Sequence, residues 1–262
     1  MSLQKFTLIT NDDFRLSLVL EKLSSECSGH VVLAHGITSD KNEDGFYTRL
    51  SQYLAENMYM VSRFDFRGHG ESSGNSKDFN VNGQIEDFST VLDWASDSYQ
   101  LPIAIIAASF GAPAAINTTI DHESIIHALV LLNPVLDFNR TFVNPEVPWL
   151  KGKFSSDILI SALNNNGIEL TPDFTLGKKL IRELLELRPY EKLTRIKCPV
   201  LSIHGDHDEY VPYEVTAQYY KANEKSRLLT IEGANHGFGI ENEQIVFTSC
   251  KEWLDQNLIN AN

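Results

Sequence analysis

The chain has 262 residues, of which 42% are hydrophobic, and carries a formal net charge of −13. This length suits one large domain or two small ones, and the acidic balance argues against nucleic acid or an anionic membrane surface as a partner. Three widely spaced cysteines favour a reducing compartment over a disulfide framework. Since the sequence holds no leader-like segment and no run long enough to span a membrane, we expect a cytoplasmic protein.

Strands and helices alternate along most of the sequence. Residues 4–12 and 14–22 predict an antiparallel pair. Runs of Val, Ile, Leu and Ala without a polar face predict buried strands near 30–35, 60–66, 102–108, 128–133, 199–204 and 227–232. Amphipathic segments around 44–57, 82–98, 111–120 and 242–258 predict the helices between them. The expected fold class is α/β, a mostly parallel central sheet with helices on both faces, in a single domain over residues 1–262.

Two glycine-containing turns follow the early strands. The strand at 30–35 ends in His35-Gly36-Ile37, and the strand at 60–66 leads into the glycine-rich turn 68–74. That turn lacks the Gly-Lys-Ser/Thr end of a phosphate-binding loop, so we expect no nucleotide site. From its place in a tight turn, His35 is interpreted as a loop-packing residue.

Ser109 is the candidate nucleophile. The segment 105–111 reads Ile-Ile-Ala-Ala-Ser-Phe-Gly, an apolar strand that delivers one serine into a turn before a helix. The small residues Ala107 and Gly111 tolerate a strained backbone there. The free N–H groups and positive dipole end of the following helix point towards any negative charge that forms on a substrate.

The region from about 136 to 195 breaks the alternation of strands and helices. Prolines and scattered aromatic side chains mark it, among them Phe138, Phe142 and Trp149. We expect a cap insertion whose apolar side chains shape a pocket over the serine and exclude water. The alternative is that these aromatics only bury the cap against the body.

Acid and base candidates follow two late strands. The turn after 199–204 holds Asp206 and Asp208, and the strand at 227–232 ends in a loop that carries His236. A serine hydroxyl needs a base, and the base needs an orienting carboxylate, so the chain order Ser, acid, His supplies all three groups. No histidine pair has the spacing of a zinc motif, so no metal site is expected.

Together these motifs resemble an α/β-hydrolase, with the elbow, acid loop and histidine loop in that family's order. The resemblance selects Asp208, three residues after Gly205 and before Val211-Pro212, with Asp206 as the competitor. It also implies an oxyanion hole formed by the backbone amides of Ile37 and Phe110. No metal or organic cofactor is implied.

Within the family the pattern resembles cinnamoyl or feruloyl esterases and monoacylglycerol lipases, the serine aminopeptidase S33 type. The resemblance implies hydrolysis of small-molecule carboxylic esters, with a pocket that includes His35, Phe138, Phe142 and Trp149. The sequence departs from the esterase pattern at Ala107, where glycine is commoner, and at Phe110, where glutamine is frequent.

Two other functions stay open. An elbow with alanine also occurs in some thioesterases, so an acyl thioesterase or acyltransferase acting on CoA or carrier-protein esters is the alternative. A non-catalytic ligand-binding module is the third reading, because a fold alone does not fix function.

Overall fold

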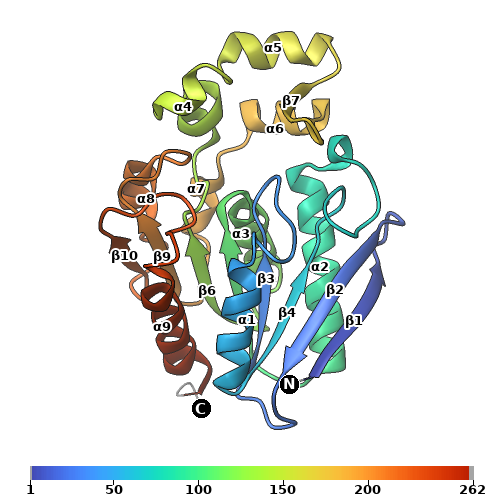
Figure 1. Cartoon of the computed structure of the whole chain (residues 1–262), viewed down its shortest axis with the longest axis vertical. Coiled ribbons are helices and arrows are strands. Elements are labelled where there is room, and N and C mark those ends of the chain that lie inside the picture. Colours follow the sequence, from blue (N-terminus) through green and yellow to red (C-terminus); the bar gives the residue numbers. More distant parts are fainter. Residues whose placement is uncertain (1, 260–262) are drawn as a thin grey trace.

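The computed structural model describes residues 2–259, and one eight-stranded sheet runs through the centre of the molecule (Figure 1). Its strands, in chain order, are β1 (Ser2–Ile9), β2 (Arg15–Lys22), β3 (Gly29–Ala34), β4 (Tyr59–Phe64), β5 (Ile103–Ala108), β6 (Ile126–Leu132), β9 (Val200–Gly205) and β10 (Arg227–Ile231). The expected α/β class with a mostly parallel sheet is confirmed.

The strand order in the sheet is β1-β2-β4-β3-β5-β6-β9-β10. The predicted antiparallel pair is β1 and β2, in register from Ser2 opposite Lys22 to Ile9 opposite Arg15. Strand β2 also pairs with β4 antiparallel, and every pairing from β4 to β10 is parallel. The carboxyl ends of the parallel strands therefore meet at one edge, where ligands bind in open α/β sheets.

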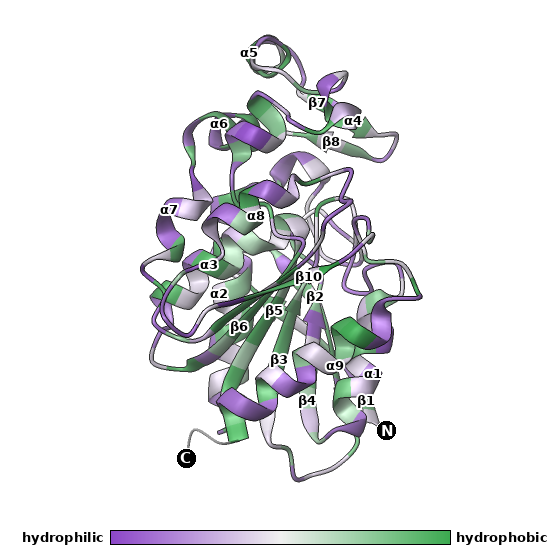
Figure 2. Cartoon of the chain, turned by 90° about the vertical axis from the view of Figure 1, so that its left-hand side faces the viewer, coloured by the Kyte–Doolittle hydropathy of each residue, from purple (hydrophilic) through white to green (hydrophobic). Residues whose placement is uncertain are grey.

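Helices cover both faces of this sheet. On one face lie α1 (Phe46–Glu56) and α9 (Glu243–Leu254), and on the other lie α2 (Val81–Ser98) and α3 (Ala112–Asp121). Alternate residues of β3 serve the two layers: Val31 packs in the cluster with α1 and α9, and Val32 in the cluster with α2 and α3. This two-sided burial explains the continuous apolar strands, which are coloured as hydrophobic in Figure 2.

The first and last predicted helices differ from the structure at their ends. Helix α1 begins at Phe46 rather than at residue 44, because Asp44 and Gly45 have positive φ angles, which are incompatible with a right-handed helix. Helix α9 ends as an α-helix at Leu254, and the chain continues as a π-helical turn over Asp255–Ile259. A short helix that the sequence did not predict, α8 (Tyr213–Tyr219), follows β9.

The chain between β6 and β9 is the cap segment, defined here as residues 136–195. It stands over the carboxyl end of the sheet (Figure 1). Its regular elements are a π-helical turn (Asn139–Val143), α4 (Pro148–Lys151), α5 (Ser156–Asn164), β7 (Ile168–Thr171), β8 (Phe174–Leu176), α6 (Lys178–Glu186) and α7 (Pro189–Leu193). Strands β7 and β8 form a separate antiparallel pair.

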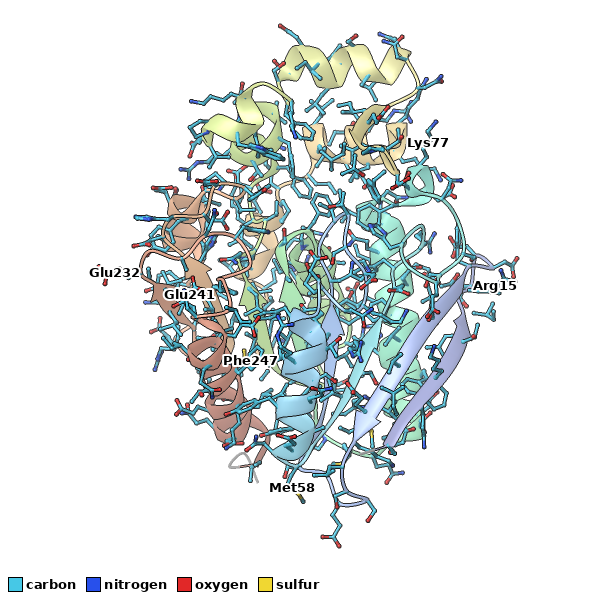
Figure 3. The ribbon with its side chains drawn as sticks, viewed as in Figure 1. Arg15, Met58, Lys77, Glu232, Glu241 and Phe247 are labelled. Atoms are coloured by element: carbon cyan, nitrogen blue, oxygen red, sulfur yellow. The ribbon has the colours of Figure 1, made fainter. Side chains whose placement is uncertain are left out.

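One side of the cap segment is fastened to the body at the start of α2. The carboxylate of Glu183, on α6, accepts hydrogen bonds from the backbone N–H groups of Val81 (2.6 Å) and Asn82 (3.2 Å). At Gly177, an added Cβ would lie 2.3 Å from the carbonyl oxygen of Lys77, a residue that Figure 3 labels just below the cap. Body and cap backbones therefore touch here, and only glycine fits.

No helix within residues 2–259 is both long enough and apolar enough to cross a membrane.

Candidate active site

Ser109 lies at the sharp turn between β5 and α3. Its φ angle is 49°, in the left-handed region that residues with a side chain seldom adopt. The turn packs tightly against the end of β3, because a Cβ on Gly111 would lie 2.7 Å from the carbonyl oxygen of His35. The small residue in the sequence motif is thus required by the close approach of two backbones, and the turn lifts the serine to the sheet edge.

A chain of hydrogen bonds joins Ser109, His236 and Asp208. Nε2 of His236 lies 3.1 Å from Oγ of Ser109, and Nδ1 of the same ring lies 2.7 Å from Oδ2 of Asp208. With the carboxylate accepting from Nδ1–H, Nε2 is free to accept the proton of the serine hydroxyl. The arrangement can therefore activate a serine oxygen for attack on an electrophilic carbon.

Asp208 is buried and fully hydrogen-bonded. Its Oδ1 accepts from the backbone N–H groups of Tyr210 (2.8 Å) and Val211 (2.9 Å), and its Oδ2 also contacts Nε2 of His204 at 3.1 Å. Burial alone would raise the pKa of this carboxyl, but the hydrogen bonds from His204 and His236 outweigh burial and hold the pKa well below its usual range. Asp208 is therefore a carboxylate at neutral pH.

Asp206, the competing acid, does not contact His236. Its Oδ1 accepts a hydrogen bond from the backbone N–H of Gly233 at 2.6 Å. Asn235 makes a second link between the two loops, because its side-chain oxygen accepts from the N–H groups of Glu209 (2.8 Å) and His236 (2.7 Å). These contacts hold the acid loop and the histidine loop against each other.

The peptide between Gly36 and Ile37 is held by His35. Nε2 of the buried His35 ring accepts a hydrogen bond from the backbone N–H of Phe66 (3.0 Å), which leaves Nδ1–H to donate to the carbonyl oxygen of Gly36 (2.7 Å). Burial lowers the pKa of His35 to about 4, so the ring stays neutral in this tautomer. In a trans peptide the N–H points opposite to the C=O, so the Ile37 N–H is directed away from the His35 ring.

The N–H groups of Ile37 and Phe110 have no hydrogen-bond partner within the described part of the chain. Phe110 lies in the first turn of the helical segment that starts at Ser109, where N–H groups have no partner inside a helix. Both residues line the cavity above Ser109. Their amides are thus available to an oxygen that develops negative charge.

A cavity of ≈ 650 Å³ opens above Ser109 and His236, beneath the cap segment. Phe142 and Trp149 lie on its wall, and further apolar wall residues are Leu150, Phe154 and Leu170. The other two predicted pocket residues do not line it. His35 is buried behind the Gly36–Ile37 peptide, and Phe138 is buried behind Phe110, on which it stacks with ring centroids 5.3 Å apart.

Among the polar residues of the cavity wall that sequence reasoning missed are Glu43 and Asn133. Asn133 follows β6 with a φ angle of 43°, and its side-chain oxygen accepts from the N–H of Gly205 at 3.0 Å. A polar residue directly after a buried strand was the available signal for Asn133. Glu43 carried no such signal in the sequence. It lies within a loop, and only the three-dimensional fold of the chain brings it beside Ser109.

No group of three or more His, Cys, Asp or Glu side chains within residues 2–259 is arranged to hold a metal ion.

The model of one protein family, described as serine aminopeptidase, S33, matches residues 25–172. This match begins before β3, passes the turn at Ser109 and ends in the cap segment, so it spans more than half of the chain.

Curated relatives and solved structures agree with this match. The chain is 24% identical over 253 residues to a monoacylglycerol lipase of Mycolicibacterium smegmatis, covering 88% of this chain and 89% of that protein. It is 22% identical to an acyl transferase of Photobacterium leiognathi, covering 87% and 74% of the two chains.

Among solved structures, Est1E of Butyrivibrio proteoclasticus with bound ferulic acid aligns with a TM-score of 0.83 and 21% identity, covering 97% of this chain and 99% of that one. An esterase of Pyrococcus furiosus aligns with a TM-score of 0.73 and 21% identity, covering 98% and 91%. These likenesses show the fold. From the family match and the architecture together, this chain belongs to the serine aminopeptidase S33 family of α/β-hydrolases.

Proposed function

We propose that this protein is a carboxylic ester hydrolase that works through a serine nucleophile. The observation that carries the proposal is the hydrogen-bond chain from Ser109 through His236 to Asp208, which lies on the floor of the cavity beneath the cap segment. The monoacylglycerol lipase and esterase relatives support ester hydrolysis as the reaction.

The first half-reaction forms an acyl-enzyme. Oγ of Ser109 attacks the ester carbonyl carbon while Nε2 of His236 takes the hydroxyl proton. Asp208 keeps the imidazole in its tautomer and stabilises the imidazolium. The amides of Ile37 and Phe110 donate to the carbonyl oxygen as it becomes an oxyanion. His236 then gives its proton to the departing alcohol.

The second half-reaction releases the acid. A water molecule enters where the alcohol left, His236 takes one of its protons, and the resulting attack breaks the bond between the acyl carbon and Ser109. The proton returns to Oγ, and the carboxylic acid leaves. No cofactor takes part in either step.

The apolar wall under the cap segment favours small to medium acyl groups or aromatic acids. Phe142, Leu150 and Phe154 supply this wall, and apolar surface removed from water there stabilises a bound hydrocarbon by about 25 cal/mol per Å². The likeness to a structure with bound ferulic acid supports an aromatic acid as the acyl group.

An acyltransferase or thioesterase acting on CoA or carrier-protein esters is the second candidate, and the acyl transferase relative favours it. The charges of the cavity wall are mixed. Glu43, Asp44 and Glu243 are acidic, and Arg49 is bonded through Nε to Glu243 at 2.8 Å. Phosphate recognition ordinarily uses free arginine or lysine groups, and among the described residues of the wall Lys153 is a lysine without an ion pair.

The test is hydrolysis of p-nitrophenyl esters from acetate to palmitate, of methyl ferulate and of acyl-CoA thioesters. Wild type, Ser109→Ala and His236→Ala are assayed in parallel, and circular dichroism establishes that each variant is folded. Ester turnover that both substitutions remove supports the proposal. Faster turnover of the thioesters would replace it with the second candidate, and no turnover by folded wild type would favour a ligand-binding module.

A further inference from the structure

Glu43 places a second carboxyl group in the cavity, outside the hydrogen-bond chain of Ser109. Its Oε2 accepts a hydrogen bond from the backbone N–H of Gly36 at 2.8 Å, which fixes the carboxyl against the oxyanion loop. Oε1 faces the Ser39 hydroxyl, which lies close enough to act on the pKa of Glu43 as a hydrogen-bond donor. The oxygen of this hydroxyl is buried without a hydrogen-bond partner among the described residues.

The two side chains lie next to the nucleophile. A Cβ built on Gly36 would be 3.1 Å from Cβ of Ser109 and 3.3 Å from Oε1 of Glu43. This carboxyl oxygen and the serine therefore flank the same residue, and both Ser39 and Glu43 line the cavity. When an ester is bound at Ser109, a substrate group that contacts Oε1 of Glu43 can be only a few covalent bonds away from the ester carbonyl carbon.

The backbone that delivers Glu43 is strained. Glu43, Asp44 and Gly45 have φ angles of 46°, 50° and 86°, three successive residues in the left-handed region. For a residue with a Cβ this conformation costs roughly 1–2 kcal/mol. Backbone hydrogen bonds from Gly45 to Asn42 and from Phe46 to Glu43, both 2.9 Å, retain it. Strain of this kind concentrates at functional sites.

We propose that Glu43 and Ser39 form a subsite that binds a hydrogen-bond donor of the substrate, a hydroxyl or an ammonium group close to the scissile ester. This inference rests on the proposed ester hydrolysis and names the substrate class. A carboxylate oxygen accepts from either donor, and the Ser39 oxygen accepts from the same group or donates to a hydroxyl.

The electrostatic surroundings of Glu43 favour a hydrogen-bond donor of the substrate beside its carboxyl group. Burial raises the pKa of Glu43 to about 7, and the exposed Asp44 adds to the rise, whereas the Gly36 N–H, the charge of His236 and the Ser39 hydroxyl oppose it. Arg49 on the cavity wall is bonded to Glu243, and Lys153, also on the wall, lies over the ring of Trp149. The buried oxygen of Ser39 has no hydrogen-bond partner among the described residues, and a ligand that supplies the missing hydrogen bond removes the cost of that burial.

The experiment compares four butyrate esters of similar size. Propyl butyrate has no donor, 2-hydroxyethyl butyrate has a hydroxyl, 2-(dimethylamino)ethyl butyrate has an ammonium N–H when protonated, and choline butyrate has a cation without a donor. Wild type is expected to have the higher kcat/KM with the hydroxyl or the N–H ester. Preference for one of the two identifies the donor as alcohol or amine.

The variant Glu43→Gln isolates the subsite. Its amide oxygen still accepts from Gly36, but the oxygen that faced the substrate becomes an NH2 group. We expect kcat/KM for the preferred ester to fall by roughly 10- to 100-fold, as for loss of one hydrogen bond to a charged group, with propyl butyrate little changed. Asp44→Asn removes the same charge from the exposed neighbour and is the matched control; it should keep the preference. Ser39→Ala should weaken it.

Three results would overturn the inference. One is the absence of any preference in wild type, another is an equal loss for all four esters in Glu43→Gln, which would mean that Glu43 only holds the oxyanion loop. The third is a choline ester as good as the better of the two donor esters, which would mean that the site recognises positive charge and needs no hydrogen-bond donor.

A binding measurement separates this inference from the proposed reaction. Ligand-observed NMR follows binding of propyl and 2-hydroxyethyl butyrate to Ser109→Ala, with and without Glu43→Gln. Tighter binding of the hydroxyl ester that depends on Glu43 supports the subsite even if wild type turns over no ester. Equal binding of the two esters by both proteins contradicts it.

Discussion

His204 contacts the same carboxylate oxygen of Asp208 that His236 uses. Nε2 of His204 lies 3.1 Å from Oδ2 of Asp208, and both side chains are fully buried. Nδ1 of His204 lies 2.8 Å from Oγ1 of Thr216, so a hydroxyl that donates to Nδ1 leaves the proton on Nε2, facing the carboxylate. Two imidazoles and two backbone amides thus share the hydrogen-bonding capacity of one aspartate.

The first prediction concerns His204→Gln and Thr216→Val. Loss or disorientation of the Nε2–H donor leaves Asp208 less stabilised as a carboxylate, so Asp208 interacts more strongly with protonated His236. We expect the acid limb of the pH profile of kcat/KM to move to higher pH by roughly half a unit to one unit, with kcat reduced and KM little changed. Steady-state kinetics between pH 5 and 9 measures both effects.

A purely structural role for His204 would give a different result. Both variants would then lose thermal stability, and the maximum of kcat/KM would fall while the acid limb of its pH profile stayed in place. Asp206→Asn serves as the control, because Asp206 bonds the Gly233 amide and not a histidine.

The second prediction separates the two acids. Asp208→Asn should fold and yet lower kcat by on the order of 10⁴-fold, by analogy with the serine-protease aspartate, because an amide that donates to His236 selects the wrong tautomer. Asp206→Asn should leave kcat within a few-fold of wild type and change the melting temperature little, because the amide oxygen still accepts from the Gly233 N–H. The reverse ranking of the two variants in kcat would assign the catalytic role to Asp206.

Sequence motifs were sufficient for the sheet and for the three residues of the hydrogen-bond chain. Ser109, Asp208 and His236 each follow a continuous apolar strand, and carboxyl ends of parallel strands meet at one edge whatever the loops do. The residue types at these ends therefore predicted Ser109 and His236, and the family resemblance selected Asp208 over Asp206.

The cavity wall could not be predicted in the same way. Phe138 and Phe142 are separated by one helical turn in an aromatic-rich segment, yet Phe142 lines the cavity and Phe138 is packed behind Phe110. The difference depends on the π-helical turn at Asn139–Val143, which shifts the faces of the helix. Glu43 escaped notice because its position depends on a left-handed turn that has no simple sequence period.

The third prediction is a pH-dependent gain in stability for Glu43→Gln. The pKa of Glu43 is 4.5 in its ordinary state and about 7 in the folded protein, where burial disfavours the charge. Between these two values the unfolded chain has released the proton and the folded chain still holds it, so stability falls as pH rises, and the full penalty is present above pH 7.

Glutamine does not ionise, so the melting temperature of the variant should match wild type near pH 4 and exceed it by roughly 2–6 °C at pH 8. Differential scanning fluorimetry across this range measures the difference. Asp44→Asn, at the exposed neighbouring position, should show no such trend, and a difference that is constant with pH would exclude ionisation of Glu43 as its cause.

The fourth prediction concerns the attachment of the cap segment. Glu183→Ala removes the acceptor for the N–H groups of Val81 and Asn82 at the start of α2. Loss of such a helix cap costs about 0.5–2 kcal/mol, and Glu183→Gln should recover part of it because its amide oxygen still accepts. Thermal unfolding measures the order of the three proteins. Equal stability of wild type and Glu183→Ala would mean that water replaces the carboxylate without cost.

The last prediction uses Phe142 and Phe138 as a matched pair. Phe142 lines the cavity and packs edge-on against Phe154 with centroids 5.2 Å apart, so Phe142→Ala should lengthen the space for the acyl chain. We expect kcat/KM for p-nitrophenyl octanoate relative to butyrate to rise by about 10-fold. Phe138 stacks on Phe110 at an interplanar angle of 9° and has no exposed surface. Phe138→Ala should cost about 3–5 kcal/mol of stability and leave the chain-length ratio unchanged.

The ratio of the two rates, rather than either rate, is the decisive measurement, because a general loss of folded enzyme cancels in it. An unchanged ratio in Phe142→Ala would place the acyl chain elsewhere in the cavity, for example against Phe46 and Phe238, which also line it. A changed ratio in Phe138→Ala would mean that Phe110 moves when its stacking partner is lost. Since the Phe110 amide is one of the two proposed oxyanion donors, kcat for the short ester should then fall as well.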